Sequence, residues 1–227
     1  MDRRRIVRES LAVAVAVGTY GLSFGAVSRT NGLSVAQTCT LSLLMFSGAS
    51  QFAFVGVLGG GGAAVSAVLS AAGLGIRNGF YGLRLGGLLD IRGWRRVLVA
   101  QVVIDESTAM ALAHERHGPD ASRLAFGVTG VGVYVLWNLS TLGGALAAGA
   151  VGDPRTIGLD AAVPAAFLAL VAPRLTGRPE RRVAATAALI ALVAVGFTPA
   201  GVPVLLGALA VLAGGRITPA LAARRPS

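Results

Sequence analysis

Runs of apolar residues, each about as long as a lipid bilayer is thick, recur from the eighth residue of this chain almost to its end. A helix needs roughly 20 predominantly apolar residues to cross the hydrocarbon core of a membrane. The chain has 227 residues, of which 54% are hydrophobic and 13% charged, and its mean hydropathy is +0.72. A soluble domain carries about 25% charged residues. The sequence therefore predicts a single all-α, polytopic integral membrane domain over residues 1–227.

The apolar runs predict about eight transmembrane helices, here called segments one to eight. They fall at about residues 8–27, 35–58, 63–89, 95–114, 123–150, 157–174, 182–197 and 202–215. The last two are short and flank Pro199–Pro203. We favour a helical hairpin there, because Thr198–Gly201 has the composition of a turn. The alternative is one long helix broken at Pro199–Pro203, and such breaks tend to line cavities.

The basic residues predict the orientation in the membrane. All 20 are arginines, and most stand at the ends of apolar runs, as the positive-inside rule describes for cytoplasmic loops. If both termini are cytoplasmic, most of the arginines at span ends lie on the cytoplasmic side. Those left on the outer side are few: Arg29, Arg92, Arg95, Arg96 and Arg155. The cluster Arg92–Arg96 is the exception. The alternative is that segment three is re-entrant, but the overall count of cytoplasmic against outer arginines then agrees less well with the positive-inside rule. Because the arginines follow span ends, we expect a lipid bilayer and no nucleic acid as their partner.

Glycines are spaced for close helix contact in segments one and three. The small-residue motifs are Gly21-x-x-x-Gly25, Gly75-x-x-x-Gly79 and Gly82-x-x-x-Gly86. Glycines at this spacing let two helix backbones approach closely. The alternative is that they mark points of unwinding near a substrate.

Five ionisable side chains lie inside segments that are otherwise apolar: Arg77, Arg84, Asp105, Glu106 and Asp160. A charge at bilayer depth costs about 2.5–3.5 kcal/mol, so such residues usually face a cavity or each other. Asp160 stands early in segment six, where a carboxylate complements the positive end of a helix. We favour a capping role for Asp160 over contact with a ligand.

The other four charges are spaced to pair between segments three and four. Segment three carries one polar face: Arg77, Tyr81 and Arg84. Segment four carries another, with Glu106 turned to its side: Gln101, Asp105 and Thr108. Pairing two arginines with two acids would remove most of the burial penalty. The pairs are either structural salt bridges or a transport site, in which an arginine holds a substrate carboxylate and a buried acid carries a proton.

Other polar side chains could complete a binding pocket. Ser47 and Gln51 lie one turn apart in segment two, and a buried amide needs a partner. Gln51 is therefore a candidate for contact with an ammonium or carboxylate group. Trp137 lies mid-span, whereas tryptophan usually lies at the membrane interface, so it either forms a pocket wall or fills the core.

The sequence gives no support for an enzyme, a metal or a cofactor. Cys39 is the only cysteine, so neither an intrachain disulfide nor a thiolate cluster can form. His114-Glu-Arg-His117 lacks the two residues that a zinc-protease helix places between its glutamate and second histidine.

Three blocks of residues follow one another in a specific order along the chain. The first is Ser23-Phe-Gly-Ala26 with Phe46-Ser-Gly-Ala-Ser-Gln51. The second is Ile76-Arg-Asn-Gly-Phe-Tyr-Gly82 with Asp105-Glu-Ser-Thr108. The third is Trp137 with Gly143-Gly144, Gly158-Leu-Asp160 and Pro164–Leu170. Together they resemble the AzlC family, the large subunit of branched-chain amino-acid exporters, over roughly residues 8–215.

The resemblance implies a secondary transporter that exports valine, leucine, isoleucine or similar apolar amino acids across the cytoplasmic membrane. It also implies proton coupling and a small multi-span partner subunit of the AzlD type. In this reading a midplane pocket binds substrate through Gln51, Arg77, Asn78, Tyr81 and Trp137, and Asp105 or Glu106 carries the proton.

The sequence departs from the family pattern beside Arg77. Where the family motif has asparagine and histidine, this chain has Gly75 and Asn78. A histidine titrates near neutral pH and Asn78 does not, so proton coupling here would depend on Asp105 or Glu106. The alternative function class is a non-transporting membrane scaffold or channel subunit.

Overall fold

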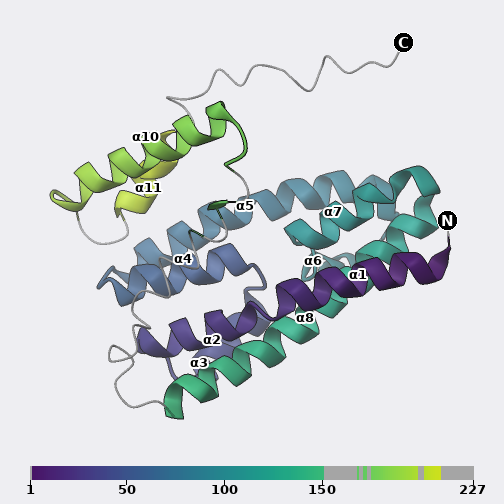
Figure 1. Ribbon diagram of the computed structural model, residues 1–227, viewed down its shortest axis with the longest axis horizontal. Coiled ribbons are helices and arrows are strands. Elements are labelled where there is room, and N and C mark those ends of the chain that lie inside the picture. Colours follow the sequence, from purple (N-terminus) through teal and green to yellow (C-terminus); the bar gives the residue numbers. More distant parts are fainter. Residues whose placement is uncertain (1, 151–167, 169–170, 173–174, 199–201, 211–227) are drawn as a thin grey trace.

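The computed structural model describes residues 2–150, 168, 171–172, 175–198 and 202–210, and every secondary-structure element in these residues is a helix (Figure 1). The helices are α1 Arg3–Gly18, α2 Gly21–Thr30, α3 Val35–Leu44, α4 Gly48–Gly59, α5 Ala64–Leu89, α6 Arg95–Ala100, α7 Asp105–Ala113, the 3-10 helix η1 Glu115–His117, α8 Pro119–Ala150, α10 Arg178–Val195 and α11 Val202–Ala208. Segment six, including Asp160, lies almost entirely outside the described residues.

Segments one and five form the two longest apolar helices of the described chain. Segment one is α1 and α2 joined by a kink at Thr19 and Tyr20, and helical hydrogen bonding resumes where Phe24 N–H donates to Tyr20 O. This helix (Arg3–Thr30, 28 residues) and α8 (Pro119–Gly149, 31 residues) are each long and apolar enough to cross a membrane.

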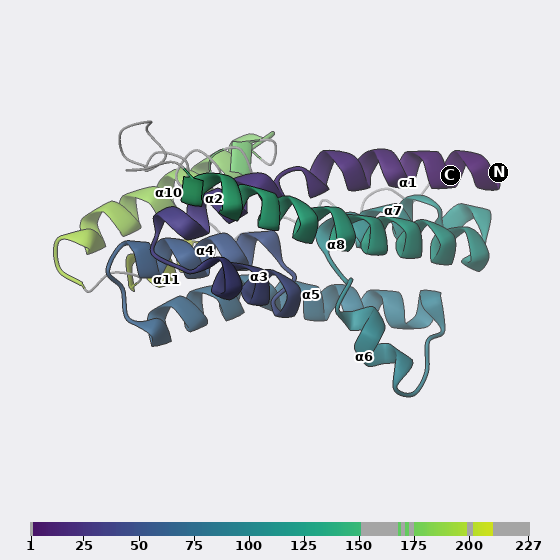
Figure 2. The same ribbon diagram turned by 90° about the horizontal axis from the view of Figure 1, so that it is seen from below.

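These two helices run parallel and pack along their whole length (Figures 1 and 2). Ala14 faces Gly132, Gly25 faces Thr141, and the Arg29 side chain reaches Gly149, so the contacts advance together along both helices. A Cβ at Gly25 would overlap the carbonyl oxygen of Thr141. The predicted packing role of Gly21-x-x-x-Gly25 is therefore confirmed.

The glycines of α5 do not have this role among the described residues. A Cβ added at Gly79, Gly82 or Gly86 would meet no described atom within 4 Å. A Cβ at Gly75 would lie 3.5 Å from Ser50 Oγ, an ordinary contact, and Gly82 and Gly86 line an open groove between α5 and α6, so the predicted close backbone approach is not made at these glycines.

Segment two is a hairpin, not a single span, so the predicted crossing at 35–58 is wrong. α3 ends at Leu44, the chain turns over Met45–Ser47, and α4 runs back. Gly59, at the end of α4, packs against the side chain of Asn31, which directly follows α2. Both ends of this hairpin therefore lie at one end of the molecule. We call α3–α4 hairpin one and Met45–Ser47 its tip.

Segment three is one continuous 26-residue helix, α5, as predicted for 63–89. The alternative of a re-entrant segment three is wrong. α5 returns the chain from hairpin one to the end of the molecule where α1 begins (Figure 2).

Segment four, predicted as a span at 95–114, is a second hairpin. α6 and α7 are separated by Gln101–Ile104, which form its tip. His114, just after α7, lies 3.4 Å from Glu9 in α1, and Arg123 Nε donates to Leu89 O at the end of α5 at 3.0 Å. The loops Asp90–Trp94 and His114–Gly118 therefore both lie at the N-terminal end of the molecule. We call α6–α7 hairpin two.

The two hairpins enter from opposite ends and their tips meet. The side-chain amide of Gln101 donates to the carbonyl of Leu43 over 2.7 Å, which joins the tip of hairpin two to the end of α3. Hydropathy did not reveal either hairpin, because a helix that crosses a membrane and a hairpin that enters and returns can have equally long apolar runs.

The last two segments form the hairpin that the sequence favoured over a single broken helix. α11 packs back on α10, with the Cβ position of Gly207 3.3 Å from Ala187 O and 3.9 Å from Ala191 Cβ. Residues 199–201 of the turn lie outside the described residues.

A larger side chain at Gly25 should separate α2 from α8. We expect Gly25→Leu to lower the stability by about 1–3 kcal/mol, the usual cost of overpacking, measured as thermal unfolding of the protein in detergent. The matched control is Gly79→Leu, whose side chain meets open space among the described residues and should leave the melting temperature close to that of the wild type. Equal melting temperatures for the two variants would contradict the close packing of α2 on α8.

Candidate functional site

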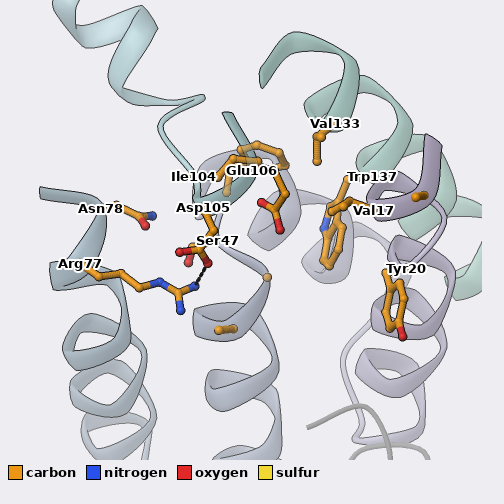
Figure 3. A pocket seen from close by; sticks show the side chains of 14 residues that line it. Val17, Tyr20, Ser47, Arg77, Asn78, Ile104, Asp105, Glu106, Val133 and Trp137 are labelled. Atoms are coloured by element: carbon orange, nitrogen blue, oxygen red, sulfur yellow. Dashed lines mark ion pairs between the residues drawn. The ribbon is translucent and has the colours of Figure 1, made fainter. Parts of the chain in front are cut away.

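A cavity of about 410 Å³ lies where the hairpin tips meet (Figure 3). This volume is within the range of small-molecule sites, roughly 300–1,000 Å³. The polar side chains of its wall are Tyr20, Ser47, Arg77, Asn78, Asp105 and Glu106. Its apolar wall includes Val17, Phe46, Ile104, Val133 and Trp137. The cavity is thus bounded by the α1–α2 kink, the starts of α4 and α7, and the middles of α5 and α8.

Two helices begin at this cavity. The first helical hydrogen bond of α4 runs from Gln51 N–H to Ser47 O, and that of α7 from Thr108 N–H to Ile104 O. The amide groups before these bonds precede the hydrogen-bonded ladder, so each helix presents the positive end of its dipole to the cavity. A negative group in the cavity is stabilised by both helix ends.

Arg77 and Asp105 form an ion pair across α5 and α7, as the sequence predicted. Arg77 Nη2 lies 3.0 Å from Asp105 Oδ2, and the Tyr81 hydroxyl donates to Asp105 Oδ1 over 2.6 Å. The Arg77 and Asp105 side chains remain 26% and 22% exposed, so the pair is accessible from the cavity and is not sealed in the core. Figure 3 shows the pair at the cavity wall beside Ser47 and Asn78.

Arg84 does not join this cluster, so the predicted pairing of both arginines with Asp105 and Glu106 is wrong for Arg84. It pairs with Glu115 at 2.7 Å, near the N-terminal end of the molecule. Seven residues of helix separate Arg84 from Arg77 by about 10 Å. That rise carries Arg84 past the cavity to the loop after α7.

The predicted shared face of Gln101, Asp105 and Thr108 is also wrong. The tip of hairpin two separates Gln101 from α7, so helical spacing does not relate these residues. Gln101 instead donates to Leu43 O, which also accepts from the hydroxyl of Tyr134 at 3.2 Å. These two side chains replace the helical partners that the end of α3 has lost.

Gln51 is fully buried behind the cavity wall. Its amide nitrogen donates to Met45 O at 2.8 Å, and its amide oxygen accepts from Trp137 Nε1 at 2.9 Å. In the structure both groups of the Gln51 amide are engaged by the protein itself, and the predicted contact between Gln51 and a substrate stays a prediction. Gln51 fixes the tip of hairpin one and the indole ring of Trp137 together.

Trp137 and Asn78 lie in the cavity wall, and Tyr81 stands behind it against Asp105. The Trp137 ring covers Gly48, where an added Cβ would lie 2.9 Å from the indole. Two buried polar atoms at the wall, Arg77 Nε and Asn78 Oδ1, have no hydrogen-bond partner among the described residues. Buried polar atoms are usually paired, so these two atoms are exceptions beside the cavity.

The sequence matches the AzlC protein family over residues 12–151, which is more than half of the chain. The chain belongs to the AzlC family. AzlC proteins are integral membrane proteins of a branched-chain amino-acid transport family and are not enzymes. The family match therefore confirms the expected membrane class and transporter class. No curated protein and no solved structure matches the chain.

The AzlC match runs from the middle of α1 to just past α8, so it includes both hairpins and all the lining residues of the cavity. It ends before α10 and α11. The family-defining part of this AzlC protein is therefore the part that builds the cavity.

Sequence reasoning missed the contribution of segment one to this AzlC cavity. Val17 and Tyr20 line it because the helix kinks between Gly18 and Gly21. Gly18-Thr19-Tyr20-Gly21 places two glycines around two polar residues within an apolar run, and this pattern is a readable kink signal. Ser47 and the Asp105-Glu106 pair are likewise helix-start residues within apolar runs.

Replacing Gln51 by leucine should destabilise this AzlC protein. Gln51→Leu leaves the Met45 carbonyl and the Trp137 N–H buried without their partner, and each such group costs about 1–3 kcal/mol. The measurement is thermal unfolding in detergent. Gln37→Leu is the control, because Gln37 is exposed near the start of α3 and should have a smaller effect. A Gln51→Leu protein as stable as the control would show that the amide does not hold the hairpin tip.

Proposed function

We propose that this AzlC protein exports branched-chain or similar apolar L-amino acids, and that it binds them in the cavity between the hairpin tips. The observation that carries the proposal is the Arg77–Asp105 pair in the wall of a cavity at which two oppositely directed hairpins meet. A wall that combines charged groups with apolar surface suits a zwitterion with an aliphatic side chain. It favours a transporter over a passive scaffold.

Each part of an amino acid finds a matching part of the wall. The carboxylate would lie near Arg77 and the positive end of α4, where guanidinium and helix dipole both favour an anion. The ammonium would lie near Glu106. Val17, Ile104 and Val133 would surround the aliphatic side chain. Among the remaining residues predicted to bind substrate, Asn78 and Trp137 belong to the wall, and Tyr81 and Gln51 act through Asp105 and Trp137.

The opposed hairpins support an alternating-access mechanism. Secondary transporters commonly bind substrate near the bilayer midplane at broken helices whose half-helix N-termini point at anionic groups. Movement of hairpin one would open the cavity to one side of the membrane, and movement of hairpin two would open it to the other. The whole chain would act as one membrane domain.

The arginines support a cytoplasmic N-terminus in this arrangement. Those at the N-terminal end of the described molecule are Arg3, Arg4, Arg5, Arg8, Arg92, Arg95, Arg96, Arg116 and Arg123, whereas Arg29 lies toward the opposite end. With segment four as a hairpin, the cluster Arg92–Arg96 ceases to be an exception to the positive-inside rule. The cytoplasmic C-terminus stays a prediction, since segment six lies outside the described residues.

Two features of the family-based reading remain part of the proposal. One is a small AzlD-type membrane subunit that completes the transporter. The other is energisation by the proton-motive force. Both are expectations for the assembled transporter in the cytoplasmic membrane.

Removing Arg77 should slow transport strongly, and removing Arg84 should not. In vesicles that contain the protein, we expect Arg77→Ala to lower counterflow of labelled valine at least about tenfold, because loss of a charged hydrogen bond costs about 1.5–3 kcal/mol. Arg84→Ala is the matched control, since its exposed pair with Glu115 contributes about 0–1 kcal/mol. Normal counterflow in Arg77→Ala would remove Arg77 from the binding site.

The loops on either side of hairpin two should face the same side of the membrane. In a Cys39→Ser background, Arg92→Cys and His117→Cys should both react with a membrane-impermeant thiol reagent from the cytoplasmic face. The control, Gly61→Cys in the loop after α4, should react from the opposite face. Labelling of positions 92 and 117 from opposite faces would restore the arrangement in which segment four crosses the membrane.

A further inference from the structure

An apolar groove of about 450 Å³ lies between α5 and α6, and it shares no lining residue with the cavity at the hairpin tips. On α5 its wall includes Gly82 and Gly86, where an added Cβ would meet no described atom within 4 Å. The buried residues of its wall are Leu85, Leu89 and Val103. None of the residues of α6 is buried, and this helix stands beside α5 at the edge of the molecule (Figure 2). The groove is therefore open to an apolar occupant.

Arginines close this groove at the N-terminal end of the molecule. Arg96 lines the groove itself, and its Nε donates to Ile91 O at 2.7 Å. Ile91 also belongs to an adjoining hollow of about 540 Å³, whose wall contains Arg92 and Arg95. The acid in the wall of this hollow, Asp90, pairs with Arg92 at 3.0 Å. Three arginines thus accompany one acid where the apolar groove ends, so an anion is favoured there.

We propose that the groove and the arginines together form a binding site for an anionic phospholipid. An acyl chain lies in the groove, and the headgroup phosphate lies among Arg92, Arg95 and Arg96. The N–H groups of a guanidinium match phosphate oxygens in pairs, and basic pockets between membrane helices bind anionic headgroups. Trp94 is 71% exposed beside these arginines, and tryptophan commonly lies in the headgroup layer of a membrane. The site is separate from the one proposed for the transported amino acid.

The charge at the end of the groove favours a lipid over a helix of another protein. A transmembrane helix could also pack into a groove lined by glycines. The cytoplasmic ends of such helices usually carry arginine or lysine. At the end of the molecule that we propose to be cytoplasmic, a second helix would therefore bring like charges to Arg92–Arg96. An anionic phospholipid brings a negative headgroup and an apolar chain in the order in which the arginines and the groove require them.

Quenching of tryptophan fluorescence by brominated lipids tests the site in the full-length protein. The protein is reconstituted in phosphatidylcholine vesicles that contain either phosphatidylglycerol or phosphatidylcholine brominated on the upper part of the acyl chain. Brominated phosphatidylglycerol should quench at a several-fold lower mole fraction, because each arginine near the membrane surface favours an anionic lipid about fivefold. Trp137 is buried in the core, so Trp94→Phe should remove the difference between the two lipids. Replacing chloride by inorganic phosphate at equal ionic strength should leave the difference in place.

Two matched pairs of variants locate the lipid. Arg96→Gln and Arg116→Gln each remove one positive charge from the same end of the molecule, but Arg116 lies in η1 and does not line the groove. Arg96→Gln should lower the preference for phosphatidylglycerol about fivefold, and Arg116→Gln should leave it nearly unchanged. Gly86→Leu places a side chain in the groove and should weaken quenching by phosphatidylglycerol. Gly79→Leu, which lies outside the groove, should not.

Each contrary result has a definite meaning. Equal quenching by the two brominated lipids would overturn the proposal and leave the groove to a helix of another chain. Equal effects of Arg96→Gln and Arg116→Gln would overturn it in favour of attraction by overall charge. Unchanged quenching in Gly86→Leu would show that no acyl chain occupies the groove, and a difference abolished by inorganic phosphate would indicate a site for free anions.

The proposal can fail without affecting the proposed transport function, because none of these measurements involves an amino acid. If Arg96→Gln does not fold, the comparison of the two lipids on the wild-type protein decides, together with Gly86→Leu.

Discussion

The carbonyl groups at the end of α3 have no following helical turn to pair with, and they lie where the tips of the two hairpins meet. Every other feature of the site depends on how these groups are satisfied. Gln101 and Tyr134 donate to Leu43 O, and Gln51 donates to Met45 O. Away from water, irregular backbone persists only where protein or a wet cavity supplies partners. The same contacts that satisfy the backbone bring both hairpin tips, α8 and the cavity together.

The close parallel packing of α1–α2 on α8 provides the frame on which this arrangement stands. Glycines at the contact allow the two helices to approach until a single added Cβ would overlap a backbone oxygen. The α8 side of this frame supplies Trp137, whose indole packs over Gly48 and is fixed by Gln51. The start of α4 is thereby placed against a rigid wall, while hairpin two approaches from the other end. A fixed frame with two opposed hairpins gives the molecule distinct parts that can stay still and parts that can move.

The sequence was sufficient for the helical membrane class, for the positions of α5 and α8 and for the Arg77–Asp105 pair, because apolar run length and charge neutrality determine these features. It was insufficient for the hairpins. An apolar run of about 20 residues has the same composition whether it crosses the membrane or turns back within it. The sequence suggested a helix break only at Pro199–Pro203. The actual breaks contain neither proline nor glycine, and their signals are helix starts: Ser47 before α4, and Asp105 with Glu106 opening α7. The error about Gln101 followed from treating segment four as one continuous helix, and the error about Arg84 from neglecting the rise of about 10 Å along α5 between Arg77 and Arg84. The role of Asp160 lies outside the described residues.

Hairpins from opposite ends of the molecule meet at the cavity that we propose binds the substrate, and this arrangement fixes the distance between the two ends of hairpin one. Spin labels at Asn31→Cys and Gly60→Cys in a Cys39→Ser background can be measured by pulsed electron paramagnetic resonance in lipid vesicles. Asn31 contacts the end of α4 directly, so the account predicts a short distance between the labels. A separation near the thickness of the hydrocarbon core, about 30 Å, would mean that segment two crosses the membrane and would contradict the account.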